Sequence, residues 1–154
     1  FVNHAFVKTI SLTYKKMPFL RIAPICNGKI YVAPRSYQGE EPGKLDIPME
    51  DYIYACKTDT DKYAKEVENK YSNHITGQPE PRFSLKHLVK ETNGVKKIIM
   101  LYILPLNDEE QIHFTGGKFV TPEEIEMNSA QYSSFLKEEV DHLNIVAQMW
   151  EEFK

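Results

Sequence analysis

The chain has 154 residues, of which 42% are hydrophobic and 27% are charged, a size and composition typical of one soluble globular domain. No apolar run approaches the length of a membrane-spanning helix, and a formal net charge of −3 gives no general attraction to nucleic acid. These features exclude a membrane span and argue against nucleic acid as a partner.

The cysteines and the first residues complete this outline. Cys26 and Cys56 match neither a disulfide framework nor a zinc-binding spacing, which is typical of free thiols in a reducing cytoplasm. Residues 1–17 have mixed polarity and predict an N-terminal arm or a short helix. We therefore expect a cytoplasmic protein in which residues 18–154 form a single domain.

The first strong pattern along the chain predicts a β-hairpin. Two apolar runs, over residues 19–25 and 30–33, flank an Asn-Gly pair at 27–28. Asn-Gly is the strongest short signal for a hairpin, because both central residues of a type I′ turn need positive φ. Arg35 follows the second run and leads into a Gly- and Pro-rich surface loop over residues 36–49, a setting in which binding residues are common.

A charged helix is predicted next. Thr58 with Asp61 three residues later is close to a capping box, so the helix should begin near Thr58. Tyr63, Val67 and Tyr71 recur every four residues and form an apolar stripe that can pack on a sheet.

The other faces of this helix are polar and include Glu68. Glu66 stands four residues before Lys70, which is the favourable orientation for a surface ion pair that stabilises a helix by about 0.2–0.5 kcal/mol. An ordinary surface role for Glu66 is therefore the simplest interpretation of this part of the helix.

A second hairpin is predicted after a break rich in Gly and Pro. Residues 83–89 mostly alternate between apolar and polar, Asn-Gly at 93–94 supplies a turn, and residues 95–106 are largely apolar. This contrast predicts a half-exposed strand beside a central strand that is covered on both faces. His87 keeps the register of the apolar positions, and we interpret it as a core or sheet-face histidine.

Two helices are predicted at the end of the chain. Thr121 and Pro122 form a clear helix start, and this short helix ends near Asn128. From about Ser133 to Phe153 apolar residues recur on one stripe, which predicts an amphipathic helix that docks on the sheet. The breadth of its apolar surface also makes a homodimer interface an alternative use of this helix.

Two segments on either side of the charged helix carry recognisable motifs. Residues 42–46 read Pro-Gly-Lys-Leu-Asp, and residues 116–125 read Gly-Gly-Lys-Phe-Val-Thr-Pro-Glu-Glu-Ile. They resemble segments of the Nudix (MutT-like) hydrolase superfamily, in particular its branch similar to isopentenyl-diphosphate isomerase. The resemblance covers roughly residues 18–128. It implies an α/β fold, a Nudix-like α/β/α sandwich with a mixed sheet and flanking helices.

Between these segments the metal-binding box of the family is degenerate. In the family, glutamates of one helix hold Mg²⁺ or Mn²⁺ against a diphosphate. Aligning Glu66 with the first of them places Asn69 and Lys70 at the following pair. Asp51 then stands at the family's glycine and Lys57 at its loop glutamate. The resemblance leaves Glu66 as a remnant metal ligand, and the Lys70 ammonium would repel a cation.

The degenerate box favours a Nudix-fold protein without metal-dependent hydrolysis and without a cofactor. It would act as a binding or interaction module for a phosphorylated small molecule or a protein partner. A cleft that loses carboxylates and gains basic residues can hold an anion without a metal. The candidate ligand-binding residues are therefore the basic ones around the predicted cleft: Arg35, Lys44, Lys57, Lys65 and Lys70. No catalytic residue is assigned, because no nucleophile or metalloprotease motif is present.

Two alternatives to this function stay open, so the sequence does not decide whether the chain is an enzyme. The first is an active Nudix-type hydrolase that cleaves a diphosphate linkage in a nucleoside diphosphate derivative. It requires Mg²⁺ or Mn²⁺ on a rebuilt site that contains Glu66, Glu68 and an acid from elsewhere, for which Glu50, Asp51 and Glu124 are candidates. The side chains of Glu66 and Glu68 lie about 200° apart around a helix, which disfavours a shared metal. The second alternative is a purely structural or dimerisation domain.

Overall fold

The computed structural model describes residues 19–52, 59–90 and 96–154. The strands are β1 (Phe19–Cys26), β2 (Lys29–Pro34), β3 (Leu45–Asp46), β4 (Met49–Tyr52), β5 (Arg82–Lys90), β6 (Lys96–Pro105) and β7 (Lys118–Val120). The helices are α2 (Thr60–Lys70), α3 (Pro122–Met127) and α4 (Ser134–Glu152), with 3₁₀ turns at Ser72–His74, Glu109–Gln111 and Ser129–Gln131. The predicted arm over residues 1–17, Cys56 and the predicted turn at 93–94 lie outside the described ranges.

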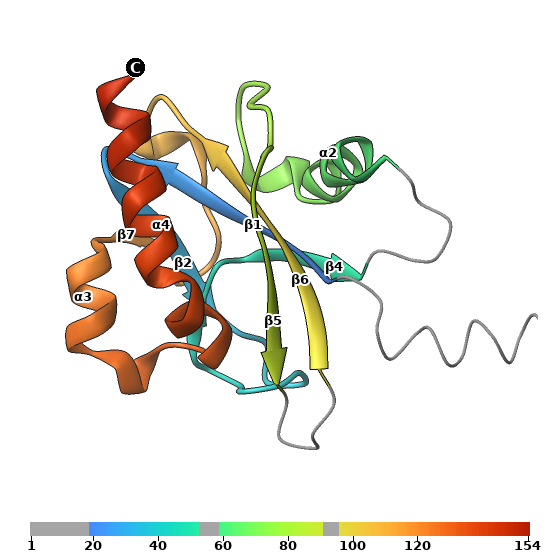
Figure 1. The fold of residues 1–154 in the computed structure, drawn as a ribbon. Coiled ribbons are helices and arrows are strands. Elements are labelled where there is room, and N and C mark those ends of the chain that lie inside the picture. The colour runs from blue at the N-terminus through green and yellow to red at the C-terminus, as the bar shows by residue number, and fades with distance from the viewer. Residues whose placement is uncertain (1–18, 53–58, 91–95) are drawn as a thin grey trace, which may run out of the picture.

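These elements form a mixed sheet of seven strands between helices. α2 packs on one face, and α3 and α4 pack on the other (Figure 1). The predicted α/β/α sandwich is therefore confirmed. The sheet order is β3-β2-β1-β6-β5, with β4 also paired to β1 and β7 also paired to β2.

Strand β1 lies at the centre of the sheet and changes partner along its length. On one side it pairs in parallel with β6. On the other side its first half pairs with β4, from Phe19↔Tyr52 to Ile22↔Met49, whereas its end pairs with β2. β2 and β4 therefore pair with different halves of the same edge of β1 and diverge from each other where one replaces the other.

Two apolar layers hold the sandwich together. Because side chains of a strand alternate between its faces, neighbouring residues of β1 enter different layers. Leu20 and Ile22 join the layer that contains Val67 of α2, while Ala23 joins the layer that contains Leu136 of α4. All five side chains are fully buried. Full burial of a Val, Leu or Ile side chain stabilises a fold by about 1.5–3 kcal/mol, so both layers contribute strongly.

Both predicted hairpins are present as antiparallel strand pairs. β1 joins β2 through Asn27 and Gly28, whose φ angles are 54° and 73°, as the type I′ prediction required. β5 pairs with β6, and β5 lies at the edge of the sheet with β6 inside it. The contrast between an alternating and a continuously apolar strand thus identified edge and centre correctly.

Helix α2 begins slightly later than predicted. Its N-cap is Asp59, whose carboxylate accepts a hydrogen bond from the Lys62 backbone N–H at 3.0 Å. The predicted capping residue Thr58 lies outside the described residues. Aspartate and threonine both cap helices, so sequence spacing alone does not choose between neighbours. The predicted apolar stripe is confirmed, since Tyr63 and Val67 are buried.

The predicted polar faces of α2 are only partly correct. Glu68 is buried and accepts a hydrogen bond from the Lys65 ammonium at 3.1 Å. Within the described residues, Lys70 pairs with Asp51 of β4 rather than with Glu66. Asp51 is partly buried whereas Glu66 is exposed. Solvent therefore screens the attraction between Asp51 and the Lys70 ammonium less than it would screen an attraction between Glu66 and this ammonium.

The two C-terminal helices agree with the predictions. Thr121 caps α3 by accepting from the Glu124 N–H at 3.2 Å, and Ser133 caps α4 by accepting from the Leu136 N–H at 3.1 Å. α4 docks on the sheet and leaves a second apolar stripe exposed: Ile145, Met149 and Phe153. No described helix is both long enough and apolar enough to cross a membrane.

Candidate functional site

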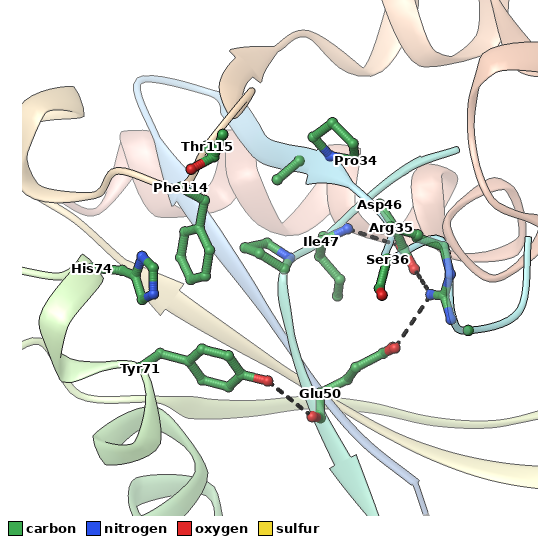
Figure 2. A pocket seen from close by; sticks show the side chains of 13 residues that line it. Pro34, Arg35, Ser36, Asp46, Ile47, Glu50, Tyr71, His74, Phe114 and Thr115 are labelled. Atoms are coloured by element: carbon green, nitrogen blue, oxygen red, sulfur yellow. Dashed lines mark hydrogen bonds and ion pairs between the residues drawn. The ribbon is translucent and has the colours of Figure 1, made fainter. Parts of the chain in front are cut away.

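A pocket of about 500 Å³ lies where β2 and β4 part. Its lining comes from the end of β2, the loop that follows, the start of β4, and the segments after α2 and before β7. The lining residues are Ala33, Pro34, Arg35, Ser36, Gly39, Asp46, Ile47, Pro48, Glu50, Tyr71, His74, Phe114 and Thr115 (Figure 2). Pockets for small organic ligands span about 300–1,000 Å³, so this pocket is the candidate site.

One side of the pocket is formed by three aromatic residues, Tyr71, His74 and Phe114, which we call the aromatic wall. The rings of His74 and Phe114 are stacked, with centroids 4.0 Å apart and planes at 7°, and the Tyr71 ring lies 5.8 Å from Phe114. Backbone contacts support the wall. The His113 N–H donates to the His74 carbonyl at 2.9 Å, and the Phe114 N–H donates to the Tyr31 hydroxyl at 2.8 Å.

The other side of the pocket is ionic. Arg35 Nη1 lies 3.3 Å from Glu50 Oε1 and also contacts Asp46, and Arg35 Nε donates to the Glu40 carbonyl at 2.7 Å. Its Nη2 has no hydrogen-bond partner among the described residues. Figure 2 shows the two sides facing the same space, and the Tyr71 hydroxyl connects them by donating to the Glu50 carbonyl at 3.3 Å.

The loop after β2 fixes the position of Arg35. The Arg35 N–H donates to the Lys44 carbonyl at 2.8 Å, which closes the loop on itself. Two side chains then tie the loop to the region where α4 begins. The Glu41 carboxylate accepts from the Ser134 N–H at 3.1 Å, and the Lys44 ammonium donates to the Ala130 carbonyl. Hydrogen bonds within the loop and between the loop and the start of α4 therefore fix the backbone from which the Arg35 side chain extends.

Behind the pocket lies a buried charge cluster centred on Arg21 of β1. The Arg21 guanidinium is fully buried and contacts Asp46 at 2.6 Å and Glu50 at 2.7 Å. Glu139 of α4 is also fully buried and lies 2.9 Å from the same guanidinium. His87 of β5 reaches Glu139 at 3.0 Å, so the predicted sheet-face histidine has a carboxylate partner.

Burial and charge shift the pKa values of the two pocket carboxyls in opposite directions. Burial raises the pKa of Glu50 above its ordinary value, the Arg21 guanidinium opposes this shift, and the Asp46 carboxylate reinforces it. Burial also acts to raise the pKa of Asp46, but the Arg21 and Arg35 guanidiniums outweigh it and lower that pKa. Asp46 is therefore the firmly ionised member of the pair.

The structure does not gather the five predicted ligand-binding residues into one site. Arg35 lines the pocket, and its role as a ligand contact stays a prediction. The Lys44 ammonium donates to the Ala130 carbonyl before α4, and Lys65 lines a separate pocket of about 420 Å³. Lys70 is tied to β4, and Lys57 lies outside the described residues.

The aromatic wall was missed by sequence reasoning. His74 and Phe114 lie far apart in the sequence and meet because an isolated bridge pairs Ile75 with Ile112. No local spacing reports such a contact. Glu50 was considered from sequence only as one possible acid of a rebuilt metal site, and the structure places it in the pocket lining.

The donor set does not fit the divalent metal that the Nudix resemblance implies. Glu66 is exposed on α2, and the two aligned ligand positions hold Asn69 and Lys70. The Lys70 ammonium is bound to Asp51, so the position that the resemblance aligns with an oxygen ligand of Mg²⁺ or Mn²⁺ holds a cation. Within residues 19–52, 59–90 and 96–154, no three His, Cys, Asp or Glu side chains form a group that suits a metal ion.

Comparison with known proteins identifies the fold. No family model and no curated protein sequence match the chain. A solved Nudix hydrolase from Nitrosomonas europaea matches over 86% of this chain and 90% of its own, with a TM-score of 0.61 and 11% identity. The C. elegans Ap4A hydrolase matches over 87% of this chain and 98% of its own, with a TM-score of 0.56 and 15% identity. The E. coli dihydroneopterin triphosphate pyrophosphohydrolase matches over 84% of this chain and 96% of its own, with a TM-score of 0.58 and 12% identity. The chain therefore has the Nudix fold.

Proposed function

We propose that this Nudix-fold protein binds a phosphorylated small molecule in the pocket between the aromatic wall and Arg35, without metal-dependent hydrolysis. The observation that carries the proposal is the composition of this pocket. It combines a stacking surface with a fixed guanidinium, whereas α2 presents Asn69 and Lys70 in place of a carboxylate pair. Such a site can hold and orient a ligand, but it lacks the donors that would bring a metal to a diphosphate.

The aromatic wall supports the ring of the ligand. His74 is exposed and Phe114 is half-buried, and their stacked rings form one aromatic surface at the pocket. Stacking of a nucleobase on an aromatic side chain contributes about 1–3 kcal/mol, measured by alanine substitution. A flat heteroaromatic ring is therefore the part of a ligand that gains most from this wall.

Lys70 is the exposed basic residue that directly precedes Tyr71 of the wall in the chain. Neither Lys70 nor its partner Asp51 is among the lining residues, so we assign to Lys70 a phosphate that extends out of the pocket to the end of α2. The Lys70 side chain is 56% exposed, and its hydrogen bond to Asp51 raises the pKa of the ammonium. The ammonium therefore stays charged and open to a second anionic partner.

The test is calorimetric titration with adenosine and guanosine mono- and diphosphates in the presence of EDTA. We expect saturable binding by the native protein. His74→Ala and Lys70→Ala should each weaken binding about tenfold, which corresponds to about 1.4 kcal/mol. The matched control is Lys62→Ala, because Lys62 is also exposed on α2 but lies about two helical turns away from Lys70 and Tyr71. It should bind like the native protein.

Two outcomes would contradict the proposal. The first is that none of these nucleotides binds in EDTA. The second is Mg²⁺-dependent cleavage of a nucleoside diphosphate derivative that is lost in Glu66→Gln, which would establish the hydrolase instead. Equal weakening by Lys62→Ala and Lys70→Ala would remove Lys70 from the phosphate site.

A further inference from the structure

Resting on the function proposed above, we propose that Glu50 and Arg35 together read the edge of the bound ring. The ligand class that fits is a nitrogen heterocycle with an N–H donor beside an acceptor on one edge, as adenine and guanine have. Glu50 and Arg35 both line the pocket, and Arg35 Nη1 lies 3.3 Å from Glu50 Oε1.

The pair keeps one acceptor and one donor for a ligand. Glu50 Oε2 accepts from Arg21 at 2.7 Å, and Glu50 Oε1 lies near Arg35 Nη1. Each carboxylate oxygen has two lone pairs, so Oε1 can accept a further hydrogen bond. Arg35 Nη2 has no partner in the part of the chain that the structure describes. An acceptor and a donor therefore stand next to each other.

The aromatic wall brings a ring to this pair. The Tyr71 hydroxyl donates to the Glu50 carbonyl at 3.3 Å, and the Tyr71 ring lies 5.8 Å from Phe114, so wall and ion pair are continuous. In Figure 2 the wall and the side chains of Arg35 and Glu50 border one space. A ring stacked on the wall would direct one edge toward these two side chains.

A nucleobase edge is complementary to the pair. In adenine, the exocyclic N–H would donate to Glu50 and the adjacent ring nitrogen would accept from Arg35. In guanine, the ring N–H would donate to Glu50 and the neighbouring carbonyl would accept from Arg35. Hydrogen bonds with an ionised partner are roughly twice as strong as neutral ones. A ring without the N–H leaves the Glu50 carboxylate partly unsatisfied once water is displaced, which weakens binding.

The experiment compares three 5′-monophosphates on the native protein by calorimetry in EDTA. AMP has the exocyclic N–H, purine riboside monophosphate lacks the amine, and N6,N6-dimethyl-AMP keeps the amine without its hydrogens. All three retain the purine ring and the phosphate. We expect AMP to bind at least about tenfold more tightly than the other two.

Glu50→Gln then tests the carboxylate with little change in shape. Its amide oxygen accepts more weakly, and its amide nitrogen can donate to the ring nitrogen of purine, so the preference for AMP should fall below about threefold. The matched control is Glu123→Gln, because Glu123 is exposed and is not among the lining residues. It should keep the native preference.

The outcomes separate this inference from the function on which it rests. If the three monophosphates bind with equal affinity and Lys70→Ala still weakens them, the binding function stands and edge reading is wrong. If none of them binds, the proposed function itself fails. If Glu50→Gln retains the native preference, the N–H is read by another group and the assignment to Glu50 is overturned.

Discussion

Asp46 and Glu50 share the Arg21 and Arg35 guanidiniums, yet their surroundings differ. Asp46 is fully buried, accepts from both terminal nitrogens of Arg21 at 2.6 and 3.0 Å, and also accepts from the Ile47 N–H at 2.8 Å. Glu50 makes one contact with each guanidinium and sits beside the Asp46 charge. Donors aimed at an ionised carboxylate favour it, whereas burial and a like charge disfavour it. This difference explains the lowered pKa of Asp46 and the raised pKa of Glu50.

Glu50→Gln should change how stability depends on pH. A carboxyl whose pKa is raised by folding binds more protons in the folded state, so its presence makes the free energy of unfolding fall as pH rises. The ordinary pKa of a glutamate is about 4.3, so the fall should begin near that pH and continue up to the raised value. Urea unfolding from about pH 4 to pH 7 should show the native protein losing stability relative to Glu50→Gln. A difference that stays constant over this range would contradict a raised pKa for Glu50.

Individual candidate residues could be proposed only where a local sequence pattern indicates their position. Arg35 was a candidate because it follows a clear strand and precedes a loop, and it lines the pocket. No such pattern indicates His74 and Phe114, since their stacking depends on pairing between distant segments. Lys65 was a reasonable candidate by charge, but its ammonium is taken up by Glu68 and the Pro79 carbonyl. Charge alone does not show which partner a lysine selects.

Among the secondary-structure elements, helix α2 depends on its cap. The Asp59 carboxylate accepts from the Lys62 N–H at 3.0 Å, which satisfies a backbone donor that the helix cannot pair. We expect Asp59→Ala to lower the free energy of unfolding by about 1 kcal/mol, the usual effect of losing such a cap. Asp59→Asn is the matched control, because asparagine caps about as well as aspartate and should restore most of the stability. Equal losses in the two variants, measured by urea unfolding, would show that the side chain acts through its charge and not as a cap.

The elements differ in how far local sequence determines them. Turn chemistry predicted both hairpins, because an Asn-Gly pair constrains the backbone of its own neighbours. The change of partner along β1, from β4 to β2, depends on how three distant segments pack. No periodicity within one strand reports it. The pocket arises from this change of partner, so no local sequence pattern located it. The α/β/α sandwich was predicted because two segments of the sequence resemble the Nudix family.

For the whole molecule, the cluster around Arg21 joins elements from both ends of the chain. Its guanidinium contacts Asp46 of β3, Glu50 of β4 and Glu139 of α4 from a central position in β1. Taking several charges out of water is costly, and the cost is offset only while every partner is present. The sheet, the loop that carries the pocket and the C-terminal helix are therefore coupled energetically through one side chain.

Arg21→Met should accordingly destabilise the whole domain. The variant leaves Asp46 and Glu139 buried without the guanidinium that contacts them both, and breaking a buried ion pair in this way costs about 3–5 kcal/mol. Arg82→Met is the matched control: Arg82 is exposed and lies 5.5 Å from the Trp150 ring centre, a contact worth about 0.5–1 kcal/mol. Urea unfolding of both variants measures the difference.

Arg21→Lys keeps the test informative if Arg21→Met does not fold. Lysine retains the charge but cannot reproduce the forked contacts to two carboxylates at once, so an intermediate loss of stability is expected. Because the cluster includes Glu50, Arg21→Lys should also weaken nucleotide binding in the pocket, and Arg82→Met should leave it unchanged. If Arg21→Met lost no more stability than Arg82→Met, the cluster would be a local feature of β1 and the elements around it would not be coupled.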